Sequence, residues 1–380
     1  MPSPGRPLIT ANQVTLARLI PMPLLSWLIY EGAHDGYENN PYMWSALIAG
    51  ILIGCTDWVD GLLARKYGPT VLGGLLDPIA DKVFIAFAYA PFADDIMKGG
   101  ESLVPAWVVA LMFTREFFIT ALRSAYEQRD LTLKTSYLAK VKTWTQMQGI
   151  GVMLLFPLVP ETKHYILQWF LGVLTVAPIA LMAVIWLTRK KVWRGALVMS
   201  ASVGPIFGLA LYGDTQLTLR WIMFAVVAIT WASGIDYIVV GWKQLRGRGD
   251  FAKADAVRLI GALALPALLF GVLVRTPTAP WPIFAILAFE LAVGGLDNLL
   301  SHHKRATKAL AWGSRVLGVS ALLGCALLLP EYATWFSIVG AVVSAVGVAA
   351  EFWRGRDYFM DKRIREKVLR EAAAADPADA

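Results

Sequence analysis

Cysteine and histidine are scarce in this chain of 380 residues, which has two cysteines and four histidines. Cys55 and Cys325 are far apart, and each lies within an apolar stretch, so neither a disulfide framework nor a cysteine-based zinc site is expected. Two histidines, His302 and His303, are adjacent in a basic segment, and none has the spacing of metal ligands. The sequence therefore offers no thiol- or imidazole-based metal site.

Charge is scarce as well. Charged residues make up 17% of the chain, against roughly 25% in a typical soluble domain, whereas 57% of the residues are hydrophobic. The mean hydropathy is +0.55. One soluble core of this size cannot bury so much apolar surface, so we expect a bilayer as the solvent. Fifteen tryptophans and twelve tyrosines suit a protein with many membrane interfaces, where such rings collect.

Long apolar runs recur along the whole chain. Each is close to the ~20 residues that a helix needs to cross the hydrocarbon core. The sequence therefore predicts an all-α, polytopic transmembrane bundle of about twelve spans. The predicted spans are 14–31, 43–65, 72–96, 103–126, 143–160, 166–188, 195–212, 218–242, 257–275, 280–300, 309–329 and 333–352.

The basic residues behind the net charge of +7 are concentrated in alternate loops between these runs. Lys66, Arg129 and Lys190 belong to the basic set of loops, whereas the other set holds little more than Lys98 and Lys163. By the positive-inside rule, this asymmetry predicts a cytoplasmic-membrane protein with both termini in the cytosol. A basic chain can also bind nucleic acid, but here the charge indicates topology, and no nucleic-acid partner is expected.

Four aspartates within 25 residues interrupt the apolar pattern where the second and third predicted spans meet the cytosol. Asp57 and Asp60 are three residues apart and Asp77 and Asp81 are four apart, so each pair lies on one helix face. A short turn makes the two helices antiparallel neighbours, which lets all four carboxylates converge. Without a cation these carboxylates would repel one another. Hard oxygen ligands favour Mg²⁺ or Mn²⁺, and four carboxylates can hold two ions.

Small and basic residues beside the aspartates complete a longer pattern. Gly61, Ala64 and Gly73 leave room for a bulky polar ligand near the helix backbone, and Arg65 offers a guanidinium that can bind phosphate. The whole segment reads DWVDGLLARKYGPTVLGGLLDPIADK. It resembles the signature of the CDP-alcohol phosphotransferase family, D-x2-D-G-x2-A-R-x8-G-x3-D-x3-D. Seven residues rather than eight separate Arg65 from Gly73, so we expect a shortened turn at 66–69.

The resemblance implies a reaction and a role for each matched residue. Such enzymes bind a CDP-linked lipid, typically CDP-diacylglycerol; an alcohol hydroxyl attacks the β-phosphorus, and CMP leaves. The resemblance implies that Asp57, Asp60 and Asp77 are metal ligands. It implies that Asp81 is the general base and also a ligand of a second ion. The residues implied in binding the CDP-lipid are Asn12, Asp57, Gly61, Ala64, Arg65, Thr70 and Gly73.

Three further stretches resemble the phosphatidylglycerophosphate synthase branch of this family, whose acceptor is glycerol 3-phosphate. They read TANQVTLARLIPMPLL, TREFFITALRSAYEQRD and LAKVKTWTQMQGI. A small dianion needs cations, which these stretches supply at the cytosolic ends of three spans. The predicted acceptor-binding residues are Arg18, Arg115, Arg123, Lys140 and Lys142. The alternative for each is ordinary positive-inside anchoring, and Glu116 is expected either to take part or to pair with a neighbouring arginine.

The resemblance covers only part of the chain, because members of the family usually have about six spans. The sequence then predicts a family core with a two-span insertion, a four-span extension without an assigned role, and a cytosolic tail. Homodimers are common in the family, so a homodimer is a further expectation. The predicted units are 1–245 with an insertion at about 163–217, then 246–353, and then 354–380.

Other readings stay open from sequence alone. The same chemistry on another acceptor, such as inositol phosphate or serine, is one alternative. A twelve-span transporter is another, although transporters commonly place their charged sites near the midplane of the membrane. Glu290 and Asp297 share one face of the tenth predicted span, where they mark either a second polar site or hydrogen bonding between helices.

Overall fold

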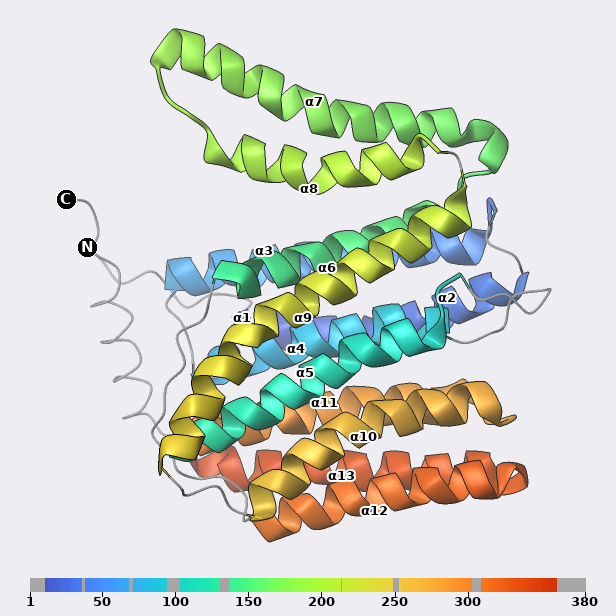
Figure 1. The fold of residues 1–380 in the computed structure, drawn as a ribbon, viewed down its shortest axis with the longest axis vertical. Coiled ribbons are helices and arrows are strands. Elements are labelled where there is room, and N and C mark those ends of the chain that lie inside the picture. The colour runs from blue at the N-terminus through green and yellow to red at the C-terminus, as the bar shows by residue number, and fades with distance from the viewer. Residues whose placement is uncertain are drawn as a thin grey trace.

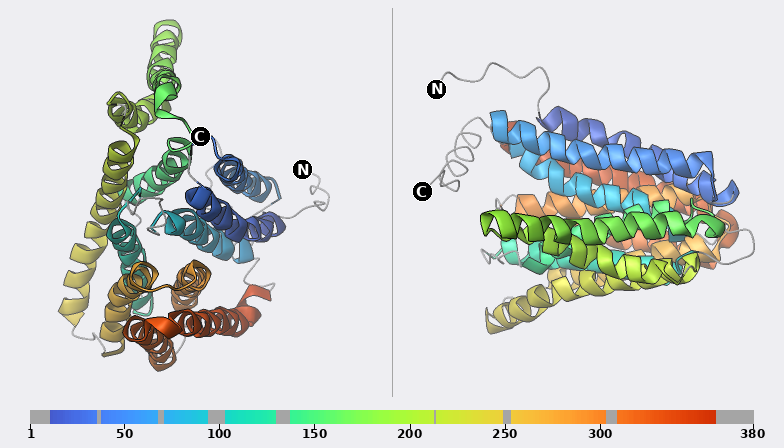
Figure 2. Two further views of the ribbon diagram at one scale, coloured as in Figure 1. Left: turned by 90° about the vertical axis from the view of Figure 1, so that its right-hand side faces the viewer. Right: turned by 90° about the horizontal axis from the view of Figure 1, so that it is seen from above.

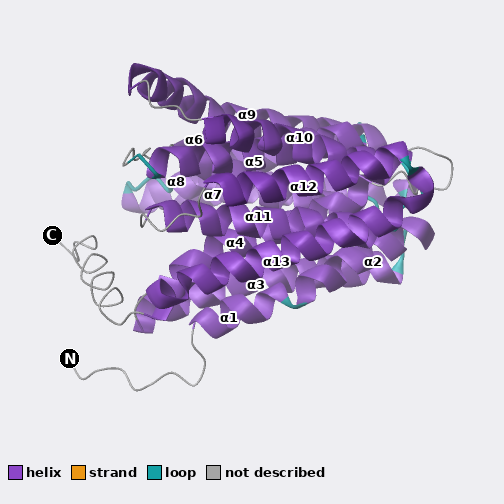
Figure 3. Ribbon diagram, turned by 90° about the horizontal axis from the view of Figure 1, so that it is seen from below, coloured by secondary structure: helices purple, strands orange, loops and turns teal. Residues whose placement is uncertain are grey.

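The computed structural model shows an all-helical protein, with no strand among the residues that it describes. The long helices lie side by side, parallel or antiparallel to one another, in one bundle (Figures 1 and 3). This confirms the predicted fold class of a helical bundle. The described residues are 11–35, 38–67, 71–93, 103–129, 137–212, 214–248, 253–302 and 309–360.

The first six helices build the part of the bundle that carries the aspartate motif. Helix α1 contacts both α3 and α4, and α6 packs against α3, α4 and α9. The first predicted span, 14–31, is divided at Ile20 into α1 and α2, because Pro21 has no amide hydrogen with which to continue the helix. The bounds are α1 (Ala11–Leu19), α2 (Pro21–Asp35), α3 (Pro41–Tyr67), α4 (Val71–Tyr89), α5 (Ala106–Glu127) and α6 (Tyr137–Leu155).

Helices α7 (His164–Arg189) and α8 (Arg194–Ala210) form a hairpin that packs mainly against itself. It stands off one side of the bundle and reaches the rest of the protein through α8 and α9 (Figure 2). Large apolar side chains cover the outside of α7; Trp169, for example, is 74% exposed. A helix that is apolar on its outer face suits a lipid environment. The hairpin falls within the predicted insertion, although the domain division itself remains a prediction.

The last helices pack directly onto the part of the bundle that holds the aspartate motif. Helix α10 lies against α5, and α11 lies against both α4 and α5, while α12 and α13 are outermost (Figure 1). The rings of Phe113 and Phe270 stack at 5.9 Å across the α5–α10 contact. The bounds are α9 (Thr215–Arg248), α10 (Lys253–Arg275), α11 (Pro280–His302), α12 (Ala309–Leu328) and α13 (Ala333–Met360).

Six of the described helices are long and apolar enough to cross a membrane. Two shorter apolar helices are found at Gly195–Ala210 and Arg315–Leu328. Each of the twelve predicted spans coincides with a helix or, for the first, with a pair of helices. The chain is thus a multi-pass helical protein, and the full count of twelve spans remains a prediction. The six candidate spans are Pro41–Leu63, Glu161–Arg189, Thr215–Val239, Asp255–Arg275, Pro280–Ser301 and Pro330–Arg356.

Candidate active site

The four aspartates of the motif converge on one guanidinium, that of Arg18 on α1. Arg18 Nη1 lies 2.5 Å from Asp57 Oδ1 and 3.8 Å from Asp60 Oδ2. Arg18 Nη2 lies 3.9 Å from Asp77 Oδ1 and 3.5 Å from Asp81 Oδ1. The predicted convergence of carboxylates from α3 and α4 is therefore present, with a cationic side chain at its centre.

Thr15, one turn before Arg18 on α1, joins the two aspartate pairs. Its Oγ1 lies 3.1 Å from Asp60 Oδ2 and 3.0 Å from Asp77 Oδ1. Because the hydroxyl has a single proton, it donates a hydrogen bond to one of the two at a time. Thr15 and Arg18 are both buried. Helix α1 is therefore part of the site, because it contributes both of these side chains.

Exposure separates one aspartate from the other three. The side chain of Asp60 is 5% exposed, whereas those of Asp57, Asp77 and Asp81 are 56%, 46% and 37% exposed. Three carboxylates can therefore meet a ligand that arrives from solution at this end of the bundle. Gly61, next to Asp60, leaves open space beside α3, because a Cβ atom there would meet nothing within 4 Å.

The donor set suits a hard divalent cation. It consists of four carboxylates and a hydroxyl, without thiol or imidazole. As arranged around Arg18, however, no three acidic, histidine or cysteine side chains among the described residues stand close enough together to hold an ion. The chemistry of the site fits a metal, and the guanidinium now supplies the neutralising charge. Asp57, Asp60, Asp77 and Asp81 are the residues that would hold it.

Replacing Arg18 with glutamine should make the stability of the protein depend more strongly on Mg²⁺. The change removes the cation that four carboxylates share. The free energy of unfolding should fall by only about 1–3 kcal/mol, because three of the carboxylates stay open to water. Thermal unfolding should begin at a lower temperature in EDTA, and added Mg²⁺ should raise the unfolding midpoint more than in the wild type. Arg315→Gln, which breaks a pair with Glu290 far from this site, is the matched control. An equal response to Mg²⁺ in Arg18→Gln, Arg315→Gln and the wild type would contradict a cation site here.

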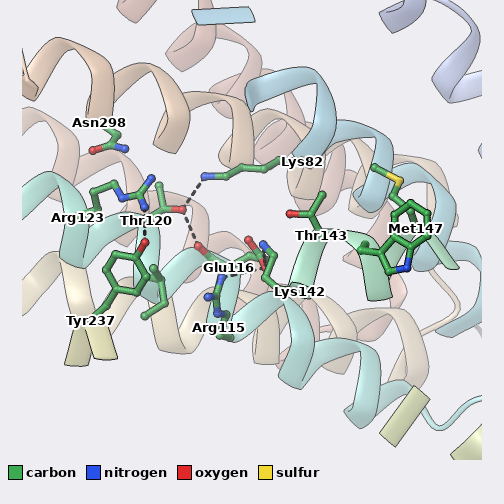
Figure 4. A pocket seen from close by; sticks show the side chains of 12 residues that line it. Lys82, Arg115, Glu116, Thr120, Arg123, Lys142, Thr143, Met147, Tyr237 and Asn298 are labelled. Carbon is green, nitrogen blue, oxygen red and sulfur yellow. Dashed lines mark hydrogen bonds and ion pairs between the residues drawn. The ribbon is translucent and has the colours of Figure 1, made fainter. Parts of the chain in front are cut away.

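A second polar site lies beside the aspartates as a cavity of about 560 Å³. Its walls come from α4, α5, α6, α9 and α11, and four cationic side chains line it (Figure 4). A cavity with this excess of positive charge suits a small anion such as a phosphate ester. Its polar lining is formed by Lys82, Arg115, Glu116, Thr120, Arg123, Lys142, Thr143, Tyr237 and Asn298.

Glu116 organises the cations of this pocket. Its Oε1 accepts hydrogen bonds from Lys142 Nζ at 2.7 Å, Arg115 Nη1 at 3.2 Å and Gln146 Nε2 at 3.3 Å. Arg115 Nη2 also donates to Ser233 Oγ on α9 at 2.8 Å. Glu116 and Arg115 are both 4% exposed. One buried carboxylate thus holds a buried arginine and a partly buried lysine in fixed positions.

Other polar contacts fix the remaining cations of the pocket. Lys82 Nζ donates to Thr120 Oγ1 at 2.7 Å, and Thr120 Oγ1 donates to the carbonyl of Glu116 at 2.6 Å. Arg123 Nη2 donates to the Tyr237 hydroxyl at 3.0 Å, and its guanidinium lies over the same ring. The pocket is therefore prearranged by the protein's own hydrogen bonds (Figure 4).

The structure brings together three of the five predicted acceptor residues. Arg115, Arg123 and Lys142 line the pocket, whereas Arg18 lies among the aspartates instead. The side chains of Asn12, Ala64, Arg65 and Lys140 lie outside the described residues, and so does Thr70.

Sequence reasoning missed Lys82, Thr120, Tyr237 and Asn298 as lining residues. The position of Lys82 directly after Asp81 was a signal that could have revealed it. These two neighbours link the two sites: Asp81 faces the aspartate cluster and Lys82 lines the cationic pocket. The Cα atoms of consecutive residues are about 3.8 Å apart, so the two sites adjoin.

The fold and the two sites define a multi-pass helical protein with an aspartate cluster beside a cationic pocket. Residues 8–235 match the CDP-alcohol phosphatidyltransferase family, and the chain belongs to that family. It is therefore a transferase, and members of the family generally use divalent metal ions. The match includes the four aspartates and the cations of α5 and α6, and it ends before α10.

Relatives of this chain carry more specific names. A protein of Bacillus subtilis (strain 168), named CDP-diacylglycerol–glycerol-3-phosphate 3-phosphatidyltransferase, is 33% identical over 151 residues, which are 38% of this chain and 75% of the relative. A probable phosphatidylglycerophosphate synthase of Mycobacterium tuberculosis (strain ATCC 25618 / H37Rv) is 37% identical over 147 residues, 38% of this chain and 65% of the relative. A protein of Cereibacter sphaeroides with the same name as the Bacillus relative is 28% identical over 249 residues, 64% of this chain and 97% of the relative. No solved structure matches the chain.

Proposed function

We propose that the protein transfers the phosphatidyl group of CDP-diacylglycerol to glycerol 3-phosphate, which releases CMP and forms phosphatidylglycerophosphate. The names of the relatives support this activity. The observation that carries it is the adjacency of Asp81 and Lys82, which places a carboxylate beside a pocket for a small anion. Such a pair of sites is what the attack of a phosphorylated alcohol on a metal-bound diphosphate requires.

The acceptor binds through its phosphate in the cationic pocket. Lys82, Arg115, Arg123 and Lys142 line this pocket, and only one carboxylate, that of Glu116, balances them there. A dianionic phosphate supplies the missing negative charge and accepts charge-assisted hydrogen bonds. With its phosphate in the pocket, the acceptor directs a hydroxyl toward Asp81.

Asp81 accepts the proton of the attacking hydroxyl as general base. Two divalent ions, Mg²⁺ or Mn²⁺, would be held by Asp57, Asp60, Asp77 and Asp81 and would supply positive charge against the diphosphate. Gly61 leaves the open space beside α3 that the cytidine diphosphate group needs. Asn12, Ala64, Arg65, Thr70 and Gly73 complete this CDP-lipid site.

The proposed topology follows from the same assignment. Twelve spans place both termini in the cytosol, together with the end of the bundle that holds the aspartates. A water-soluble acceptor and the CMP product then enter and leave on that side, while the diacylglycerol part stays in the bilayer. We also expect the protein to form a homodimer, because homodimers are common in the family.

The test is an acceptor panel with purified protein in detergent–lipid micelles. With CDP-diacylglycerol and Mg²⁺, CMP release should be at least about 10²-fold faster, as kcat/KM, with glycerol 3-phosphate than with glycerol or serine, because these lack the phosphate. The lipid product should carry one glycerol phosphate group. Preferred use of inositol phosphate would support the second candidate acceptor, and no CMP release with any alcohol would overturn the proposal.

A further inference from the structure

Helix α11 contributes to the cationic pocket although it lies beyond the stretch that matches the family. The matching stretch ends at residue 235, whereas α11 spans Pro280–His302. Asn298 on α11 lines the pocket, at the same end as Arg123 and Tyr237 (Figure 4). The C-terminal extension, which had no role assigned from sequence, therefore forms part of a wall of this site.

Close packing and polar contacts fix α11 against α4 and α5. A Cβ atom on Gly295 would lie 2.7 Å from Ile79 Cγ1, and one on Gly294 would lie 3.2 Å from Thr120 Cγ2. Only glycine allows helices to approach this closely without a shift. Gln128 Nε2 on α5 also donates to Ser301 Oγ on α11 at 3.3 Å. The side chain at position 298 is thus carried by a helix that is held firmly in place.

The side chain of asparagine is uncharged and can both accept and donate hydrogen bonds, which distinguishes it from the four cations of the pocket. Lysine and arginine side chains only donate. Several other acceptor atoms of the pocket already bind its polar side chains: Glu116 Oε1 accepts from three side chains, and Thr120 Oγ1 and the Tyr237 hydroxyl accept from Lys82 and Arg123.

The amide oxygen of Asn298, by contrast, is buried and has no hydrogen-bond partner in the described part of the chain. An acceptor left unpaired is unfavourable, so the amide gains when it turns this oxygen toward a ligand hydroxyl in the pocket that Asn298 lines.

We propose that Asn298 Oδ1 accepts a hydrogen bond from the secondary hydroxyl of the acceptor alcohol, and that α11 thereby makes the C-terminal extension part of the acceptor site. This inference rests on the proposed function. The cations of the pocket bind the phosphate but do not distinguish acceptors by their carbon chains. Asn298 recognises the hydroxyl on the central carbon and so selects glycerol 3-phosphate over phosphate esters that lack this hydroxyl.

The test compares two acceptors on Asn298→Ala and the wild type. The second acceptor is 3-hydroxypropyl phosphate, which keeps the phosphate and the attacking primary hydroxyl but lacks the secondary one. Asn298→Ala should lower kcat/KM for glycerol 3-phosphate about tenfold and change that of the analogue by less than about twofold. If the analogue turns over slowly, its inhibition constant against glycerol 3-phosphate gives the same comparison. KM for CDP-diacylglycerol should stay unchanged in the variant.

Two further variants separate recognition from a structural role. Ser301→Ala, one turn later on α11 and outside the pocket lining, should leave the preference between the two acceptors unchanged. Asn298→Asp keeps the shape of the side chain but adds a negative charge, so it should weaken both phosphorylated acceptors more than alanine does. An equal loss with both acceptors in Asn298→Ala, or no loss with either, overturns the inference while the proposed function stands. A wild type that does not use glycerol 3-phosphate overturns the proposed function itself.

Discussion

Replacement of Asp81 by asparagine is expected to lower kcat for CMP release by about 10²–10⁴-fold, the usual contribution of a positioned general base. Asparagine keeps the size of the side chain but cannot take up the proton of the attacking hydroxyl. The variant should still fold, because the Asp81 side chain is 37% exposed and three other carboxylates remain around Arg18. The measurement is CMP release at saturating CDP-diacylglycerol and glycerol 3-phosphate, together with the midpoint of thermal unfolding.

A matched control exists at the start of α9. Asp214 is an exposed aspartate whose Oδ1 accepts a hydrogen bond from the Leu217 amide at 2.9 Å. Asparagine fills this capping position about as well, so Asp214→Asn should keep full activity and stability. If Asp81→Asn retains more than about a tenth of wild-type kcat, the base is another group. If it loses binding of CDP-diacylglycerol instead, Asp81 acts chiefly as a ligand for the metal–diphosphate complex.

The aspartate site was largely predictable because its geometry is local. Spacings of three and four residues place each aspartate pair on one helix face, and a short connection makes α3 and α4 antiparallel. Arg18 was harder to place. It lies on α1, a helix of nine residues, which is too short to reveal by periodicity which face meets α3 and α4. The sequence therefore predicts that Arg18, a basic residue near the cytosolic end of a span, binds the acceptor, whereas the structure places it between the aspartates.

The cationic pocket was predictable only in part because it is assembled from distant segments. Arg115 and Lys142 are separated by 27 positions, and a resemblance to known stretches indicated both. Tyr237 lies 114 positions from its partner Arg123, and Asn298 comes from a helix that no motif covers. No local pattern indicates which of the last four helices packs against α4 and α5. That depends on side-chain shape, such as the glycines of α11 against Ile79 and Thr120.

The C-terminal acidic residues show how a tertiary structure decides between two sequence interpretations. Glu290 Oε1 lies 3.1 Å from Arg315 Nη1 on α12 and accepts a hydrogen bond from Ser344 Oγ on α13 at 2.8 Å. Asp297 Oδ1 lies 3.4 Å from Arg258 Nη2 on α10. These acidic side chains bridge α11 to three neighbouring helices, which agrees with interhelical hydrogen bonding.

Replacement of Glu116 by glutamine is expected to destabilise the free protein by about 3–5 kcal/mol, because it leaves buried cations without their counter-charge. Arg115 and Lys142 both pair with Glu116, and Lys82 and Arg123 line the same cavity. Glutamine can still bond to one of them but carries no charge. The midpoint of thermal unfolding should fall well below that of the wild type.

Glycerol 3-phosphate should reverse much of this loss in Glu116→Gln, because its phosphate supplies the negative charge that the pocket then lacks. A ligand that binds only the folded protein stabilises it by about RT ln(1 + [L]/Kd), so its effect on the unfolding midpoint should be larger in this variant than in the wild type. The measurement is thermal unfolding with increasing glycerol 3-phosphate, with glycerol as the uncharged comparison.

Glu290→Gln is the matched control for this experiment. Glu290 is also a buried carboxylate that pairs with an arginine, Arg315, but the pair lies in the C-terminal helices and outside the lining of the cationic pocket. The variant should lose stability by a similar mechanism and gain no more from glycerol 3-phosphate than the wild type does. If glycerol 3-phosphate stabilises both variants equally, or if glycerol works as well as its phosphate ester in Glu116→Gln, the cations around Glu116 do not bind the phosphate. The acceptor would then have to bind beside the aspartates, where Arg18 lies 3.5 Å from Asp81.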